Sequence, residues 1–223
     1  MDDLVERDGL YYKKFTVVPF TGNLTGKTQG TIKNGNKVGP WVRYHDNGQL
    51  LEKGTYKDGK RHGPWVVYHD NGQLLEKGTY KDDEADGLFH KFYRNGQLAT
   101  KGTYRDDKRD GLWVIYHDNG QLKEKGTYKD GKKDGPWVEY HQNGQLQREG
   151  NFRDSKFDGP WIFYHDNGQL WSKGIYKDNK RDGHWVFYYD NGQLSSKGTF
   201  KDGEKVGSWV HYTSDGIGIT IEN

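Results

Sequence analysis

The sequence predicts an all-β protein: a single elongated, twisted antiparallel meander of tandem 24-residue β-hairpin repeats, with a solenoid-like architecture. Three observations support this prediction. A glycine followed two residues later by Trp or Phe recurs every 24 residues, and an Asn-Gly-Gln-Leu turn follows it seven times at a constant distance. Asn-Gly between β-forming residues is the strongest short hairpin signal, and the repeats show no helical period. Each repeat is therefore expected to contain two strands and two turns.

The composition agrees with a β-fold whose core consists of a few large side chains. The hydrophobic fraction is 31%, well below the ~45–50% of ordinary globular domains. Aromatic residues, however, make up 15% of the chain, and each can bury roughly 150–250 Å². The 32 glycines indicate many tight turns. We therefore expect a folded aromatic core and not a disordered chain.

The repeat register divides the chain into three parts. Residues 1–38 are expected to form an N-terminal cap and a half repeat, and residues 39–206 seven hairpin repeats. Residues 207–223 are expected to form a partial repeat and a C-terminal cap strand, because isoleucine alternates strictly over 217–221. The repeat glycines are Gly39, Gly63, Gly87, Gly111, Gly135, Gly159, Gly183 and Gly207.

The pattern also predicts how the strands of one hairpin pair. A three-residue Asp-Asn-Gly loop with Gly in the left-handed conformation would place Tyr68 opposite Leu74 and Trp65 opposite Lys77. The tryptophan would then share a face with the lysine and with two variable positions, away from the constant valine, tyrosines and second glycine. A two-residue loop would instead set Trp65 over Gly78, and it mixes constant with variable positions. We therefore favour the three-residue loop.

The whole pattern resembles a known repeat. Gly-x-Trp-x-x-Tyr-x-x-Asn-Gly-Gln-Leu-x-x-x-Gly-x-Tyr-x-Asp-Gly-Lys looks like the MORN repeat variant of bacterial proteins, and the resemblance covers most of the chain. Residues 7–22 also resemble the N-terminal segment of the YwqK-like antitoxin family, which is placed beside polymorphic toxins. The resemblance implies no catalytic residues. The third repeat departs from the pattern at 83–86, Phe89 and Arg94, so a local distortion is expected there.

Charge and residue content exclude several classes of function. The 34 Lys and Arg nearly balance the 32 Asp and Glu, so the net charge of +2 gives no electrostatic case for nucleic acid. Without cysteine there is no disulfide or thiolate metal site. The first residues do not form a signal peptide, and no apolar run reaches the ~20 residues of a membrane span. A cytoplasmic location is expected if Met1 is the native start, and a periplasmic or secreted one if a signal peptide was removed.

Two repeated polar motifs are expected to be structural. Five histidines recur at one repeat position, but successive members would stand ~10 Å apart, whereas Zn–N bonds are ~2.0–2.1 Å long. The Asp of each Asp-Asn-Gly turn lacks the other ligands of a calcium loop, and it is expected to brace the turn by bonding backbone amides. We therefore expect no metal, no cofactor and no catalytic residues. The histidines are His45, His69, His117, His141 and His165.

A series of lysines also recurs with the repeat. In the favoured register each lysine lies opposite the Trp of its own repeat, where cation–π stacking with a buried stem would explain it. The alternative is a cationic stripe that meets lipid headgroups or an acidic protein. The members are Lys53, Lys77, Lys101, Lys125, Lys173 and Lys197.

The variable positions indicate a candidate binding site. Phe163 and Trp171 occupy the two variable positions of one hairpin, and the favoured register brings Trp185 beside Trp171. An aromatic cluster on an exposed face is a candidate hot spot for a partner. The alternative is local packing, for example beneath Phe157. The candidate partner-binding residues are Trp161, Phe163, Trp171, Trp185 and Phe187.

These observations predict a non-enzymatic binding protein with a protein partner. Its role would be antitoxin-like or immunity-like, with an elongated β-face that neutralises the partner by steric covering. The alternative is a structural or scaffold protein that associates with membrane phospholipid or with itself through its end strands. The sequence names neither the partner nor the oligomeric state.

Overall fold

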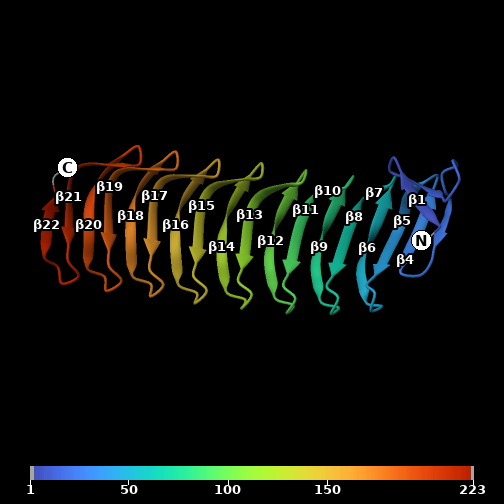
Figure 1. Ribbon diagram of the computed structural model, residues 1–223, viewed down its shortest axis with the longest axis horizontal. Helices are drawn as coiled ribbons and strands as arrows, with labels where there is room; N and C mark the ends of the chain where they lie inside the picture. The colour runs from blue at the N-terminus through green and yellow to red at the C-terminus, as the bar shows by residue number, and fades with distance from the viewer. Residues whose placement is uncertain (1–2, 222–223) are drawn as a thin grey trace. The chain divides into compact units, whose positions relative to one another are not determined.

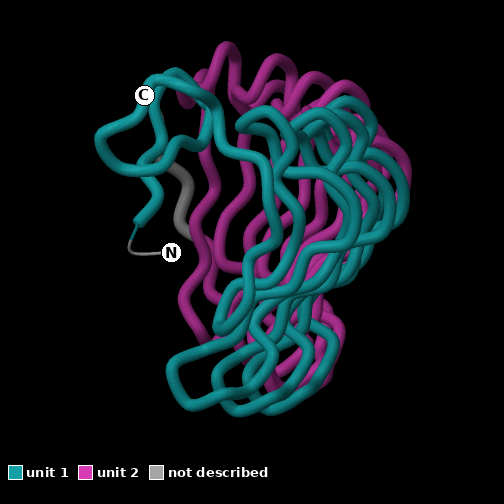
Figure 2. Tube along the Cα trace, turned by 90° about the vertical axis from the view of Figure 1, so that its right-hand side faces the viewer, with its two compact units in different colours: residues 1–108 teal, residues 109–223 magenta. Residues whose placement is uncertain are grey.

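In residues 3–221, which the computed structural model describes, every regular element is a β-strand (Figure 1). The predicted all-β fold of tandem hairpins is therefore confirmed. None of these residues belongs to a helix that is long and apolar enough to cross a membrane. The chain divides into two compact units, 1–108 and 109–223, and the strands of each unit are visibly curved (Figure 2).

The first unit is a meander in which β3 to β12 pair with antiparallel neighbours. A separate hairpin of β1 and β2 precedes it where the N-terminal cap was expected. The strands of the first unit are β1 (Leu4–Arg7), β2 (Leu10–Lys13), β3 (Gly22–Leu24), β4 (Thr28–Lys33), β5 (Asn36–Tyr44), β6 (Leu50–Lys57), β7 (Lys60–Arg61), β8 (Gly63–Tyr68), β9 (Leu74–Lys81), β10 (Glu84–Ala85), β11 (Gly87–Phe92) and β12 (Leu98–Arg105).

The second unit repeats the same meander from β13 to β22. Its last strand lies where the alternating isoleucines predicted one. The strands are β13 (Lys108–Tyr116), which begins at the last residue of the first unit, β14 (Leu122–Lys129), β15 (Lys132–Tyr140), β16 (Leu146–Arg153), β17 (Lys156–Tyr164), β18 (Leu170–Lys177), β19 (Lys180–Tyr188), β20 (Leu194–Lys201), β21 (Glu204–Tyr212) and β22 (Gly218–Ile221).

Both turns of the repeat have the expected chemistry. In the Asn-Gly turn, the His69 amide donates to the Gln73 carbonyl at 2.8 Å, and Gly72 has a φ of +82°. In the second turn, Asp58 and Gly59 both have positive φ, +51° and +83°. Two successive positive φ values define a type I′ turn, whose twist matches that of the flanking strands. The three-residue loop and the left-handed glycine are thus confirmed.

The predicted strand pairing is correct only beside the turn. Tyr68 lies opposite Leu74 as expected, but a β-bulge follows immediately and shifts the rest of the hairpin by one residue. Trp65 therefore lies opposite Gly78, and Lys77 lies opposite Val66. The predicted Trp–Lys pairing is wrong because the bulge inserts one residue into one strand only. Since side chains alternate with a period of two, this shift moves the lysine to the face away from the tryptophan.

The core of each unit is a row of interlocked rings, here called the aromatic ladder. The repeat Trp or Phe is at most 3% exposed and meets a Tyr or Phe of a neighbouring strand edge to face, with ring centroids 5.0–6.4 Å apart. Such edge-to-face pairs stabilise aromatic contacts beyond simple burial. The ladder rings of the first unit are Trp41, Tyr56, Trp65, Tyr80, Phe89 and Tyr104. Those of the second unit are Trp113, Tyr128, Trp137, Phe152, Trp161, Tyr176, Trp185, Phe200 and Trp209.

The third repeat keeps the common hairpin despite its unusual sequence. Its turn at Asp82 and Asp83 also has two positive φ values, +54° and +76°. Its first strand is interrupted at Asp86, between β10 and β11, but the second repeat has the same interruption at His62, between β7 and β8. The expected distortion is thus limited to a break that a neighbouring repeat shares.

Candidate functional site

The repeated histidines join one repeat to the next. The Nε2 atom of each lies 3.0–3.4 Å from the backbone carbonyl oxygen of the residue 23 positions later, as His45 does with Tyr68. This contact supports the expected structural role. Among residues 3–221, no group of three or more His, Cys, Asp or Glu side chains is arranged to hold a metal ion.

The asparagine of each Asn-Gly turn, and not the preceding aspartate, braces that turn. Asn47 accepts a bond from the Gln49 amide at 3.0 Å and donates to the Asp70 carbonyl in the next turn at 2.6 Å. The carboxylate of Asp46 instead forms an exposed ion pair with Lys27. The expectation that the aspartate bonds the backbone amides is therefore wrong here, because asparagine supplies both an acceptor and a donor from one side chain.

The cations that stack on the ladder come from a different repeat position than predicted. Lys77 lies on the other face, 5.9 Å from the Phe92 ring, whereas the Nζ atom of Lys133 lies 3.9 Å from the Trp137 ring centroid. Burial lowers the pKa of Lys37, a member of the observed series. That series is Lys37, Arg61, Arg109, Lys133, Arg181 and Lys205. The 24-residue period of this series is the signal in the sequence that could have identified these cations. Ala85 and Phe157 take the two remaining positions of the period.

The five candidate residues divide between core and surface. Trp161 and Trp185 are each 1% exposed and belong to the aromatic ladder. Phe163 and Phe187 are half-buried and stack on these tryptophans at 5.9 and 5.8 Å. Trp171 is 43% exposed. A partner could therefore reach Trp171 and the edges of the two phenylalanines, but not the ladder tryptophans.

Trp171 leans on Phe163. The two rings meet edge to face at 5.9 Å, and the strand pairing places Ser172 opposite Phe163 on one side and opposite Phe187 on the other. The expected arrangement with Trp185 beside Trp171 is therefore replaced, and it is Phe163 whose ring lies 6.3 Å from Trp185. The reason is again the bulge, which leaves Trp171 unpaired at the end of its strand.

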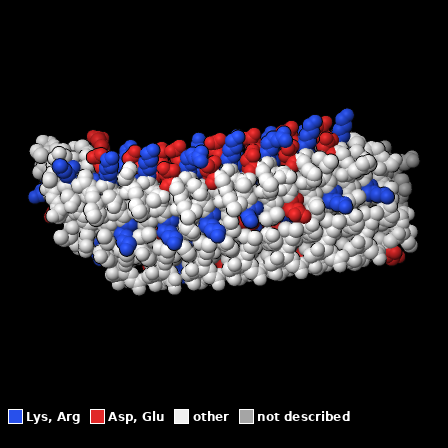
Figure 3. Space-filling view, turned by 180° about the vertical axis from the view of Figure 1, so that it is seen from behind, with Lys and Arg blue, Asp and Glu red and all other residues white. Residues whose placement is uncertain are grey.

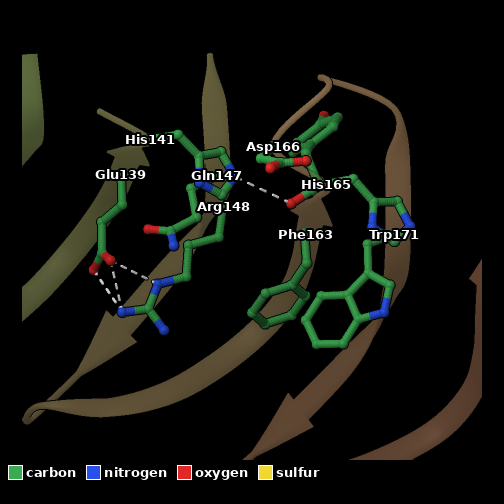
Figure 4. A pocket seen from close by; sticks show the side chains of 9 residues that line it. Glu139, His141, Gln147, Arg148, Phe163, His165, Asp166 and Trp171 are labelled. Atoms are coloured by element: carbon green, nitrogen blue, oxygen red, sulfur yellow. Dashed lines mark hydrogen bonds and ion pairs between the residues drawn. The ribbon is translucent and has the colours of Figure 1, made fainter. Parts of the chain in front are cut away.

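The rings of Phe163 and Trp171 form one wall of an open cleft of about 650 Å³ (Figure 4). The opposite wall carries Arg148, whose Nε and Nη2 atoms each donate to Glu139 at 2.8 Å. A bidentate pair of this kind has a fixed geometry. The lining residues are Glu139, His141, Gln147, Arg148, Phe163, Tyr164, His165, Asp166 and Trp171.

The surroundings hold this cleft in place. The Trp137 indole donates to Glu139 at 3.1 Å, and the Arg148 guanidinium lies 5.5 Å from the Phe157 ring. Phe157 itself packs against Trp161 at 4.3 Å, so local packing beneath Phe157 accounts for the inner rings. Burial and a hydrogen bond to Glu149 raise the pKa of Tyr164. The cleft thus offers an exposed indole, an ion pair and polar groups to a ligand.

Comparisons with known proteins place the repeat. The model of the MORN repeat variant matches seven segments: 37–58, 61–82, 85–106, 109–130, 133–154, 157–178 and 181–202. A comparison with curated proteins gave no match. Among solved structures, the crystal structure of TcdB2-TccC3-Cdc42 is 12% identical with a TM-score of 0.22, and that of TcdB2-TccC3 is 12% identical with a TM-score of 0.21. The alignments cover 83% of this chain but 12% and 14% of those chains. With TM-scores this low, these likenesses support no conclusion about the chain.

Proposed function

Because this chain belongs to the family of MORN repeat variant proteins, we propose that it is a non-catalytic binding protein whose ligand is another protein. The residues that recur from repeat to repeat have structural roles. The histidines and asparagines form hydrogen bonds to the next repeat, and the ladder rings pack against it. Departures from the repeat are then the places where a binding function can differ between members. The cleft at Trp171 is one such departure.

The observation that carries the proposal is the exposure of Trp171. An indole that is 43% exposed lies beside a half-buried phenylalanine and an ion pair. Interface hot spots are enriched in Trp, Tyr and Arg, and polar groups usually surround them. A protein side chain that entered the cleft would cover Trp171 and Phe163 while Arg148 and Glu139 met its polar groups.

The distribution of charge favours a protein over a polyanion. Along one edge of each unit, Lys and Arg alternate with Asp and Glu (Figure 3). Some of these charges pair across successive turns, as Lys132 does with Asp154 at 3.1 Å. Interleaved charges cancel over a distance of about one Debye length, ~8 Å in physiological salt. They therefore provide little attraction for nucleic acid or an anionic bilayer.

A finer proposal is that the chain acts as an antitoxin or immunity-like protein that neutralises its partner by covering it. A rigid β-face needs to bury only about 800 Å² on each partner to form a stable complex. The resemblance of the N-terminal segment 7–22 to antitoxin-type proteins motivates this proposal. The test is co-purification with the product of the adjacent gene, and failure of that protein to bind would contradict the antitoxin role.

The binding site is tested by comparing two substitutions at the same repeat position. Trp171→Ala should weaken binding of the adjacent gene product about thirtyfold or more, since hot-spot truncation costs roughly 2 kcal/mol or more. Lys123→Ala, at the equivalent bulge position of an earlier repeat, should leave binding unchanged. Circular dichroism of both variants establishes that they fold. Wild-type affinity in Trp171→Ala would exclude the cleft, and flotation of the chain with phosphatidylserine vesicles would favour the membrane alternative.

A further inference from the structure

The third repeat lacks the cation that the aromatic ladder carries in six repeats, and in the sixth repeat Phe157 fills the same position. Position 85 is equivalent to the stacking cations at 37, 61, 109, 133, 181 and 205, but it is occupied by alanine. The ladder ring four residues later is Phe89, where most repeats have tryptophan. The contacts of Phe89 are with the rings of Tyr80 and Tyr104, and no cation of the described chain lies over it. Two smaller side chains in one repeat leave room that the other repeats fill.

That room is an open depression of about 280 Å³ within the first unit. Ala85 lies in it at 7% exposure and Phe89 at 3%. Rings and carboxylates dominate its wall, a combination that suits a cation. The lining residues are Arg61, Glu76, Tyr80, Asp83, Ala85, Phe89, Lys91, Tyr104 and Asp107.

The preceding repeat shows how a guanidinium occupies the equivalent place. Arg61 lies over the Tyr80 ring at 3.9 Å, and its Nε atom lies 3.3 Å from the Oδ1 atom of Asp83. The same Asp83 oxygen accepts the Arg61 backbone amide at 2.8 Å. The second repeat therefore holds Arg61 between a ring 19 residues later, Tyr80, and a carboxylate 22 residues later, Asp83.

One repeat further on, Tyr104 and Asp107 take the equivalent positions, whereas Ala85 supplies no cation. Tyr104 stands 19 residues and Asp107 stands 22 residues after Ala85, and the Oδ1 atom of Asp107 accepts the Ala85 backbone amide. The other charged groups of the wall are already paired, Lys91 with Glu76 and Arg61 with Asp83. The Asp107 carboxylate has no such ion pair among the described residues.

We propose that this depression binds the ammonium or guanidinium group of a lysine or arginine side chain presented by a protein partner. The cation takes the place that Arg61 occupies in the preceding repeat, with its charge against Asp107 and its stem against Phe89. The site lies in the first unit and does not use the cleft at Trp171. The inference rests on the proposed function only in taking its cation from a protein.

A titration of the isolated chain tests the site without any partner. The probes are n-butylammonium and n-propylguanidinium, with pentan-1-ol as a neutral probe of similar size and pentanoate as an anionic one. We expect both cations to shift the NMR signals of the Ala85 methyl group and the Ala85 and Phe89 amides. A single cation over rings beside one carboxylate predicts a Kd of roughly 1–50 mM. The stronger of the two responses identifies lysine or arginine as the preferred side chain.

Two substitutions at the same residue make the test specific. Ala85→Arg restores the repeat cation and should abolish the response to both cationic probes, read at the amides of residue 85 and Phe89, whereas Ala85→Ser keeps the space and should retain it. Circular dichroism verifies the fold of each variant. Equal shifts with pentan-1-ol, a full response in Ala85→Arg, or no response at 100 mM probe, about twice the weakest expected Kd, would each overturn the proposal. A loss of partner binding in Trp171→Ala alone would leave it standing, so the two ideas fail separately.

Discussion

The indole of Trp65 lies directly against the backbone of Gly54 on the neighbouring antiparallel strand. A β-carbon at Gly54 would come within 3.0 Å of three atoms of the ring. The same contact recurs between Gly126 and Trp137, one strand apart in the second unit. Glycine is required at this position because the ladder ring takes the space of its side chain.

Gly54→Ala should therefore destabilise the first unit. The added methyl group forces the buried Trp65 out of its place, and overpacking of this kind costs about 1–3 kcal/mol. Thr55→Ala on the same strand is the control, since Thr55 is exposed and its loss should cost less than about 1 kcal/mol. Urea unfolding followed by tryptophan fluorescence measures both. Equal midpoints for Gly54→Ala and the wild type would show that the ring moves without cost.

Most of the fold could be predicted because residue pairs that are typical of turns recur at fixed positions of the repeat. Asn-Gly marks one turn and Asp-Gly or a relative marks the other, so strand limits follow by counting. The bulge beside Tyr68 could not be predicted in the same way. Its extra residue is Leu75 in this repeat and Trp171 in another, so no residue type marks it. Because the bulge residue was not counted, every lysine of the predicted series was placed on the wrong face of the sheet.

The candidate site could be predicted in part. The clustering of aromatic residues at 161–187 led to Phe163 and Trp171, which line the cleft. Sequence alone could not separate them from Trp161, because a ladder tryptophan and a surface tryptophan have the same propensities. Arg148 and Glu139, on the opposite wall, were not recognised, since they look like ordinary members of a charged repeat. Their pairing depends on the register that the bulge sets.

Core and surface tryptophans should respond differently to truncation. Trp161→Ala removes a ring that is 1% exposed and should cost about 3–5 kcal/mol. Trp171→Ala removes a ring that is 43% exposed and should cost less, roughly 2–3 kcal/mol, in proportion to the smaller area that it buries. Chemical unfolding of the two variants gives the comparison. If Trp171→Ala is as destabilising as Trp161→Ala, Trp171 is a core residue and the cleft cannot be an interface.

The Asn-Gly turns should depend on asparagine and not on the preceding aspartate. Asn47→Ala removes two hydrogen bonds, one within its turn and one to the next repeat, and should cost about 1–2 kcal/mol. Asp46→Ala removes only an exposed ion pair with Lys27 and should leave the melting temperature unchanged. Thermal melts of the two variants decide the matter. A larger loss for Asp46→Ala would restore the original expectation for these turns.

Stability should fall at high pH through Tyr80. Burial, the charge of Glu76 and a hydrogen bond to Glu76 raise the pKa of Tyr80 from 10.0 to about 12. The folded state therefore favours the neutral phenol. Its contribution is fully present below pH 10 and is lost as the pH rises through about 12. Tyr80→Phe has no phenol to ionise, so its melting temperature should decline less than that of the wild type over this range. Parallel declines would show that Tyr80 ionises as easily in the folded chain as in the unfolded one.

Ser155 tests how the repeat replaces glycine in its second turn. This residue has a φ of +65°, and its Oγ atom accepts the backbone amide of Lys133, 22 residues earlier, at 3.0 Å. Asn179 repeats the arrangement, with its Oδ1 atom 3.1 Å from the amide of Phe157. The side-chain bond offsets the strain of a left-handed conformation, which is of order 1–3 kcal/mol for a non-glycine residue.

The three possible replacements of Ser155 should therefore fall in a definite order. Ser155→Ala keeps the strain but loses the bond, and should be destabilised by about 1 kcal/mol. Ser155→Gly loses both and should stay close to the wild type. Ser155→Asn replaces the hydroxyl acceptor with the amide oxygen that Asn179 uses in the next repeat. Its stability should match or exceed that of the wild type. Thermal unfolding of the set gives the order. If Ser155→Ala is as stable as the wild type, the bond to Lys133 contributes nothing. If Ser155→Ala is as stable as Ser155→Gly, the turn tolerates any residue at this φ.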